Sequence, residues 1–167
     1  KNPHVSWIFS TSLRQADLLA QAATTTDRRP TPRLIIVCRQ ELAKGTGVII
    51  EALQILAPSI PDIHLDVVGD GSALAGFREM AAHGGNGARV TFHGAVNHRR
   101  VLELHHQAAL FCFPTTSSEG FPKAVLEAMA CGAPVIASDI PVFRELFEEA
   151  ALFVDPHEPK EITDAML

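Results

Sequence analysis

Short apolar runs alternate with helical stretches along most of the chain, and this alternation limits the possible folds more than any other feature. The helical stretches carry apolar residues every three to four positions, which is typical of an amphipathic helix. The expected strands are Leu34–Cys38, Leu65–Val68, Arg89–His93, Ala109–Phe113, Pro134–Ala137 and Leu152–Val154. The expected helices are Gly45–Ala57, Ser72–Ala82, His98–Gln107, Pro122–Cys131, Val142–Phe147 and a last one from Glu158. Because strands that are buried on both faces are apolar throughout, the pattern predicts an α/β fold: a Rossmann-like, doubly wound parallel sheet.

The beginning of the chain does not follow this alternation. Ser12–Ala23 places Leu13, Ala16 and Leu19 on one side of a short helix, and the polar stretch Thr24–Pro32 contains two prolines, as a linker does. We therefore divide the chain into an N-terminal helix and linker, residues 1–33, and a main domain, residues 34–167. The chain lacks an initial Met and stops within a helical pattern, so we expect it to be a piece of a longer protein.

Charge and cysteine content exclude several classes of protein. Lys and Arg number 14 against 19 Asp and Glu, a net charge of −5, and no basic face that would suit a nucleic acid is evident. The three cysteines are far apart and form no CxxC pair, which disfavours a zinc site or a disulfide framework and favours a reducing, cytosolic setting. No apolar run reaches the roughly 18 residues of a membrane span. The eight histidines lack ligand spacing, so we expect surface or loop histidines and no metal site.

The loops that follow the strands are where a ligand should bind, because parallel sheets of this kind hold ligands at the carboxyl ends of their strands. The most informative loop is Pro114–Pro122. Ser118 could cap the next helix or bind a phosphate oxygen, and Gly120 would let the backbone approach a ligand. The N–H groups at the start of that helix would then face an anion.

Two acidic residues of this region have an ordinary explanation as well as a functional one. Glu127 lies in a helix that is apolar on nearly every side, where a carboxylate needs partners. The alternative is an exposed helix edge at which Lys123 and Glu127 pair at i,i+4. Glu119 could equally be a solvated loop charge.

The loop after the first strand contains two cations, Arg39 and Lys44. Together they could clamp two phosphates, Arg as a planar fork and Lys as a point charge. The alternative is a pair of solvated cations beside Glu41. The loop Gly69–Leu74 is similar to a dinucleotide fingerprint, but the third glycine is Leu74 and the loop follows the second strand, so it supports NAD binding only weakly.

The stretch from Glu119 to Ala137 strongly resembles the Glu-x7-Glu region of retaining glycosyltransferases of the glycogen-synthase and sucrose-synthase type, often called family 4. The resemblance extends back through Val90–Val96 and Val67–Gly71 to Arg39 and Lys44-Gly45, and it covers about residues 34–155. It implies the C-terminal, nucleotide-sugar-binding half of a GT-B glycosyltransferase.

The resemblance also implies roles for individual residues. Arg39 and Lys44 would hold the diphosphate and stabilise the leaving group, Glu119 would contact the donor sugar near the reacting carbon, and Glu127 would bind the ribose hydroxyls. The remaining residues that would contact the donor are Gly69, Gly71, Gly94, Val96, Ser118, Gly120, Phe121, Pro122 and Lys123. Two departures from the family pattern are Cys38, where Gly is frequent, and Pro122, where many members have Gly.

The activity implied for the full-length protein is transfer of a hexosyl group, with retention and without metal or cofactor, from a UDP-, GDP- or ADP-linked sugar. The acceptor, a sugar or a lipid, would be bound by an N-terminal domain that this chain lacks, so we expect the chain alone to be inactive. The protein would be cytoplasmic, or peripheral at the membrane. A sugar-nucleotide epimerase, a nucleotide-binding module without catalysis and a nicotinamide oxidoreductase remain alternatives.

Overall fold

A six-stranded parallel sheet forms the centre of the computed structural model, which describes residues 32–167. The strands are β1 (Arg33–Val37), β2 (His64–Val68), β3 (Val90–Gly94), β4 (Leu110–Phe113), β5 (Val135–Ser138) and β6 (Leu152–Val154). They lie in the order β3-β2-β1-β4-β5-β6, and every neighbouring pair is parallel. From β1 the chain adds β2 and β3 on one side, and from β4 it adds β5 and β6 on the other. The two halves of the sheet therefore diverge between the neighbouring strands β1 and β4. The predicted Rossmann-like sheet is confirmed, with strand bounds that differ from the prediction by at most one residue.

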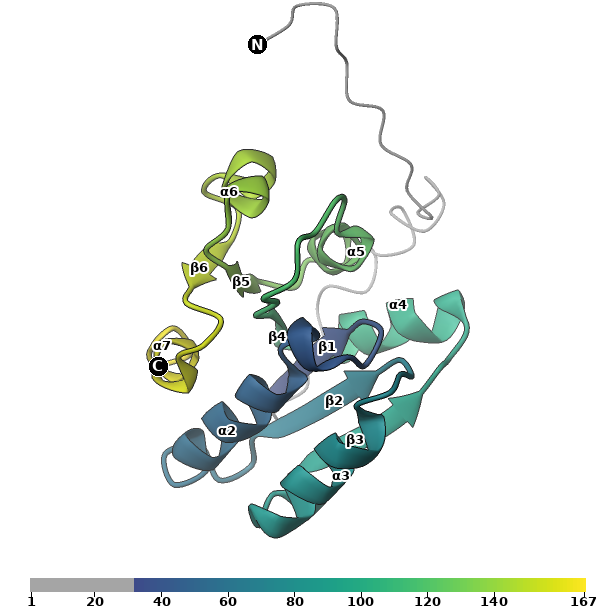
Figure 1. The fold of residues 1–167 in the computed structure, drawn as a ribbon, viewed down its shortest axis with the longest axis vertical. Helices are drawn as coiled ribbons and strands as arrows, with labels where there is room; N and C mark the ends of the chain where they lie inside the picture. Colours follow the sequence, from purple (N-terminus) through teal and green to yellow (C-terminus); the bar gives the residue numbers. More distant parts are fainter. Residues whose placement is uncertain (1–31) are drawn as a thin grey trace, which may run out of the picture.

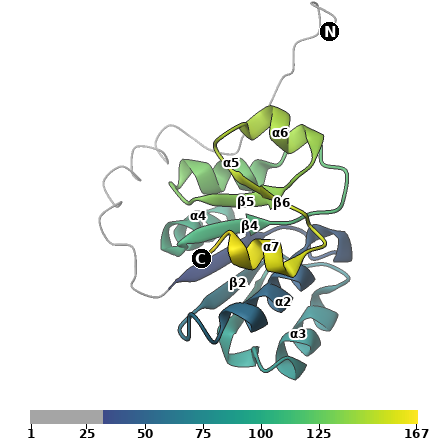
Figure 2. The same ribbon diagram turned by 90° about the vertical axis from the view of Figure 1, so that its left-hand side faces the viewer.

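Helices cover both faces of the sheet. They are α2 (Thr46–Leu56), α3 (Leu74–His83), α4 (His98–Gln107), α5 (Lys123–Ala130), α6 (Pro141–Phe147) and α7 (Pro159–Asp164). The helices α2, α3 and α7 lie along one face, and α4 and α5 lie on the other (Figures 1 and 2). Two short 3-10 helices, η1 (Leu42–Lys44) and η2 (Gly87–Arg89), are too short to leave a periodic signal in the sequence. The predicted helix Ser12–Ala23 lies outside the described residues.

The core is built from the apolar residues that predicted the strands and helices. Ile35 and Ile36 of β1 are fully buried, as are Ile49 and Leu53 of α2. Each such side chain contributes roughly 1.5–3 kcal/mol relative to an exposed position. A row of aromatic rings runs from β4 into α6, through Phe111, Phe113, Phe143 and Phe147. The core therefore extends from the centre of the sheet to the helix that follows β5.

Asp66 departs from the prediction that Leu65–Val68 is an apolar run. Its carboxylate is 1% exposed and accepts hydrogen bonds from Arg33 Nε at 2.8 Å, Arg33 Nη2 at 2.6 Å and His93 Nε2 at 2.8 Å. Burial alone would raise the pKa of Asp66, but the hydrogen bonds from Arg33 and His93 outweigh it and hold that pKa below its ordinary value. A buried carboxylate is tolerated in this strand because β1 and β3 supply its partners.

His105 contradicts the expectation of surface or loop histidines. It is fully buried on α4 against the ring of Phe111, with 5.4 Å between the ring centroids. Neither ring nitrogen has a hydrogen-bond partner among the described residues. Burial, with smaller contributions from His106 and His98, lowers the pKa of His105 to about 4. The imidazole is therefore neutral at physiological pH and packs as a core residue.

Within the part of the chain that the structure describes, no helix combines the length and apolar character that crossing a bilayer requires.

Candidate functional site

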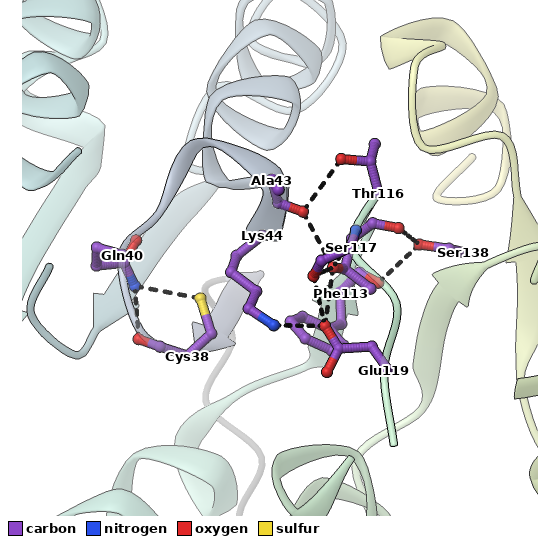
Figure 3. Close-up of polar contacts among 10 residues, drawn as sticks. Cys38, Gln40, Ala43, Lys44, Phe113, Thr116, Ser117, Glu119 and Ser138 are labelled. Atoms are coloured by element: carbon purple, nitrogen blue, oxygen red, sulfur yellow. Dashed lines mark hydrogen bonds and ion pairs between the residues drawn. The ribbon is translucent and has the colours of Figure 1, made fainter. Parts of the chain in front are cut away.

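Lys44 and Glu119 meet at the point where the two halves of the sheet diverge. Lys44 follows β1 and Glu119 follows β4, which are neighbours in the sheet. Lys44 Nζ lies 2.5 Å from Glu119 Oε1 (Figure 3), and the two side chains are only 23% and 13% exposed. The alternatives of a solvated Lys44 and a solvated Glu119 are therefore wrong. An ammonium group carries three N–H donors, so Lys44 can hold Glu119 and oxygens of an anionic ligand at the same time.

The loop after β4 is held in place by its own hydroxyl groups and by the loop after β1. Ser117 Oγ donates to Glu119 Oε1 at 2.8 Å (Figure 3), and Thr115 Oγ1 donates to the same oxygen at 3.0 Å. The Thr116 N–H donates to the carbonyl oxygen of Ala43 at 2.8 Å, and Ser138 Oγ at the end of β5 donates to the carbonyl oxygen of Thr115 at 2.6 Å. Glu119 is thus oriented before any ligand binds, as a preorganised site requires.

Gln40 joins the loops after β1 and β2, a role that was not predicted from the sequence. It is fully buried; its Nε2 donates to the carbonyl oxygen of Val68 at 3.0 Å, and its Oε1 accepts from Thr46 Oγ1 at 2.7 Å. Its backbone N–H donates to the carbonyl oxygen of Asp70 at 3.0 Å. No local pattern marks this residue, because a Gln between Arg and Glu in a loop looks solvated. Its partners become visible only in three dimensions.

The structure does not bring Arg39 together with Lys44. The Arg39 side chain is 79% exposed, with Nε 3.7 Å from Glu41 Oε1. Glu41 Oε2 in turn accepts a hydrogen bond from Ser72 Oγ at 2.6 Å, which lowers the pKa of Glu41. The alternative of a solvated cation beside Glu41 therefore describes Arg39 but not Lys44. That Arg39 binds a phosphate together with Lys44 stays a prediction. It requires the Arg39 side chain to move away from Glu41.

Glu127 is buried, with 7% exposure, in the middle of α5. The alternative of an exposed helix edge is therefore wrong, although Lys123 itself is exposed. His98, the first residue of α4, has its Nε2 3.2 Å from Glu127 Oε1. Sequence spacing does not indicate this contact, because the two residues lie on different helices.

The start of α5 differs from the expectation in two details. The residue that caps the helix is Pro122, which makes no side-chain cap hydrogen bond, so Ser118 is not the helix cap. The backbone N–H of Lys123, expected to face the donor, donates to the carbonyl oxygen of Phe121 at 3.0 Å, because the loop closes a local turn there. Ser118 and Gly120 are exposed at the carboxyl edge of the sheet, where both remain candidate donor contacts.

Gly69 and Gly71 let the loop after β2 pack directly on the loop after β1. Gly69 has a φ of 113°, and a Cβ there would overlap the carbonyl oxygen of Cys38. A Cβ at Gly71 would overlap the backbone of Gln40. Gly94 has a φ of 66° with open space around it, and Val96 packs partly buried against the core. Burial raises the pKa of the Cys38 thiol to about 12, which keeps it in the inert thiol form.

A cavity of about 500 Å³ opens at the same edge of the sheet, beside the loop after β4. Its lining residues are Thr116, Asp139, Ile140, Phe153, Asp155, Pro156, His157 and Glu161. Three carboxylates line it, and they would repel a diphosphate. The described residues contain no group of three His, Cys, Asp or Glu side chains placed to hold a metal ion. This cavity therefore does not suit a diphosphate.

A family model and the similar proteins of known name both indicate glycosyltransferases. A family model described as glycosyl transferases group 1 matches residues 22–167. A phosphatidyl-myo-inositol mannosyltransferase of Mycobacterium tuberculosis is 32% identical over 131 residues, which is 76% of this chain and 33% of that protein. An O-antigen chain mannosyltransferase of Salmonella typhimurium is 40% identical over 72 residues, which is 43% of this chain and 20% of that protein. The chain thus spans about a third or less of the length of these relatives.

Solved structures agree on the fold. Anabaena HepE in complex with UDP and glucose has a TM-score of 0.74 at 23% identity, over 92% of this chain and 42% of that one. The catalytic domain of a cholesterol-alpha-glucosyltransferase from Helicobacter pylori has a TM-score of 0.72 at 22% identity, over 81% of this chain and 84% of that one. The chain therefore belongs to the group 1 glycosyl transferases, often called family 4, and corresponds to the C-terminal, Rossmann-like half of their GT-B fold.

Proposed function

We propose that this chain binds the donor of a retaining glycosyltransferase, a nucleoside-diphosphate sugar, and that the full-length protein transfers its hexosyl group to an acceptor. The observation that carries the proposal is the pair of Lys44 and Glu119 at the divergence of β1 and β4, with the buried Glu127 eight residues further on. Lys44 supplies positive charge for the diphosphate, and Glu119 and Glu127 accept hydrogen bonds from the hydroxyl groups of the sugar and the ribose. In this proposal the anionic diphosphate meets a cation, and the hydroxyl groups of the donor meet carboxylates.

Catalysis would come mainly from charge stabilisation. As the bond between the anomeric carbon and the diphosphate breaks, negative charge accumulates on the departing phosphate, where Lys44 and a reoriented Arg39 would stabilise it. Removing one preorganised donor that stabilises developing negative charge typically costs roughly 2.7–4 kcal/mol. The acceptor, a sugar or a lipid, would be bound by a domain outside this chain. A lipid acceptor would place the protein at the cytoplasmic surface of a membrane.

The test is a transfer assay with the full-length protein. UDP-, GDP- and ADP-linked sugars are supplied with acceptor candidates, and NMR follows both nucleotide release and the anomeric configuration of the product. Several relatives are named as mannosyltransferases, one of them GDP-mannose-dependent, so GDP-mannose is the first donor to assay. We expect acceptor-dependent transfer with retention. Isomerisation of the donor without acceptor would instead support an epimerase, and binding without any turnover would support a nucleotide-binding module.

A further inference from the structure

Glu127 needs a fixed orientation if it is to recognise two neighbouring hydroxyl groups. It is buried on α5, between the fully buried Val125 and Ala128. A carboxylate in such surroundings is stable only when polar partners compensate for the lost water. The direction in which its oxygens point is then decided by those partners.

His98 lies where it can set that direction. It is the first residue of α4, and the preceding Asn97 fixes the start of the helix by accepting a hydrogen bond from the Arg100 N–H at 2.9 Å. From there His98 Nε2 reaches Glu127 Oε1 at 3.2 Å. The imidazole is 39% exposed whereas the Glu127 side chain is 9% exposed, so His98 lies on the outer side of the pair.

The chain order connects this pair to the rest of the proposed donor site. His98 follows the segment Gly94–Val96 at the carboxyl edge of the sheet, where β3 ends, and the family resemblance implies that Gly94 and Val96 contact the donor. His98 therefore links this segment, through its contact with Glu127, to the carboxylate expected at the ribose. A ring N–H that donates to one carboxylate oxygen holds the whole group in one rotamer.

We infer that His98 is a positioning residue for the ribose end of the donor: it orients Glu127 so that the carboxylate accepts hydrogen bonds from the ribose hydroxyls. This inference rests on the proposed function. The competing role is purely structural, a contact that joins α4 to α5. The two roles differ in one measurable respect. Positioning matters only for a ligand that carries ribose hydroxyls, whereas a structural contact matters for every ligand equally.

The test compares a ribonucleoside diphosphate with its 2′,3′-dideoxy analogue by calorimetric titration of this chain. His98→Ala should weaken binding of the ribonucleotide by about tenfold, the effect of one hydrogen bond of about 1.4 kcal/mol, and change binding of the dideoxy analogue by less than about twofold. His98→Gln, which keeps an N–H donor, should restore most of the loss. Arg99→Ala, on the same turn but 90% exposed, is the matched control and should bind both ligands as wild type does.

Each outcome decides between the two roles. An equal loss for both ligands in His98→Ala, or no loss for either, would overturn the positioning role while leaving the proposed function intact. Wild-type chain that binds none of the nucleoside diphosphates would overturn the proposed function, and this inference with it. Thermal unfolding of each variant, followed by circular dichroism, checks that a change in affinity is not a loss of fold.

Discussion

Replacing Lys44 by Ala in the full-length protein should lower the turnover of a nucleoside-diphosphate sugar by about 10²–10³-fold. Lys44 Nζ lies 2.5 Å from Glu119 Oε1, and its side chain is only 23% exposed. An ammonium group so placed acts on a phosphate with less screening by water than a surface lysine does. Its removal takes away the charge that the departing diphosphate needs. Steady-state kinetics with the preferred donor measure the effect.

Two controls make the Lys44 result interpretable. Lys160→Ala removes an exposed lysine from α7 and should leave turnover unchanged. In Lys44→Ala, Glu119 keeps the hydroxyl groups of Ser117 and Thr115 as hydrogen-bond partners, so the loop after β4 should stay folded, which thermal unfolding can check. Undiminished turnover in a folded Lys44→Ala variant would refute the phosphate-binding role.

Gly69→Ala should lower the free energy of unfolding by about 3 kcal/mol or more. Gly69 has a φ of 113°, a conformation that side-chain-bearing residues rarely adopt, and a Cβ there would overlap the carbonyl oxygen of Cys38. Because the overlapping atom belongs to the backbone of Cys38, no flexible side chain can move aside to relieve the overlap. Small domains are stable by only about 5–15 kcal/mol, so the loss should be large in a urea titration followed by circular dichroism.

Gly85→Ala is the matched control for this substitution. Gly85 also has a positive φ, 74°, but no atom lies within 4 Å of the position that a Cβ would take. The free energy of unfolding of Gly85→Ala should therefore fall only by the conformational cost of a positive φ, about 1–2 kcal/mol. Equal losses in the two variants would show that the packing of the loop after β2 on the loop after β1 does not govern stability.

The sheet could be predicted from the sequence because its signal is local. Most strands contain a short apolar run, and each helix repeats its apolar residues with its own period, so order and type follow from neighbouring residues. Asp66 is a charged residue inside the run of β2, and its partners Arg33 and His93 come from the two adjacent strands. A run of residues along one strand contains no information about such partners.

The site could be predicted only in part, for the same reason. The family resemblance selected Lys44, Glu119 and Glu127, and the structure brings the first two into direct contact across 75 positions of sequence. It does not group Arg39 with them. Gln40 and His98 were missed because each acts on a residue of another element, Val68 in one case and Glu127 in the other. Spacing along a chain identifies partners one helical turn apart, not partners brought together by the sheet.

Calorimetric titration of this chain with UDP, GDP, ADP and NAD tests the central claim most directly. We expect preferential binding of one nucleoside diphosphate, strongly weakened in Glu127→Ala, which removes the buried carboxylate, and in Arg39→Ala, which removes the second cation proposed for the clamp. Binding of NAD alone, or nucleotide binding that neither substitution changes, would contradict the assignment of this domain to donor binding.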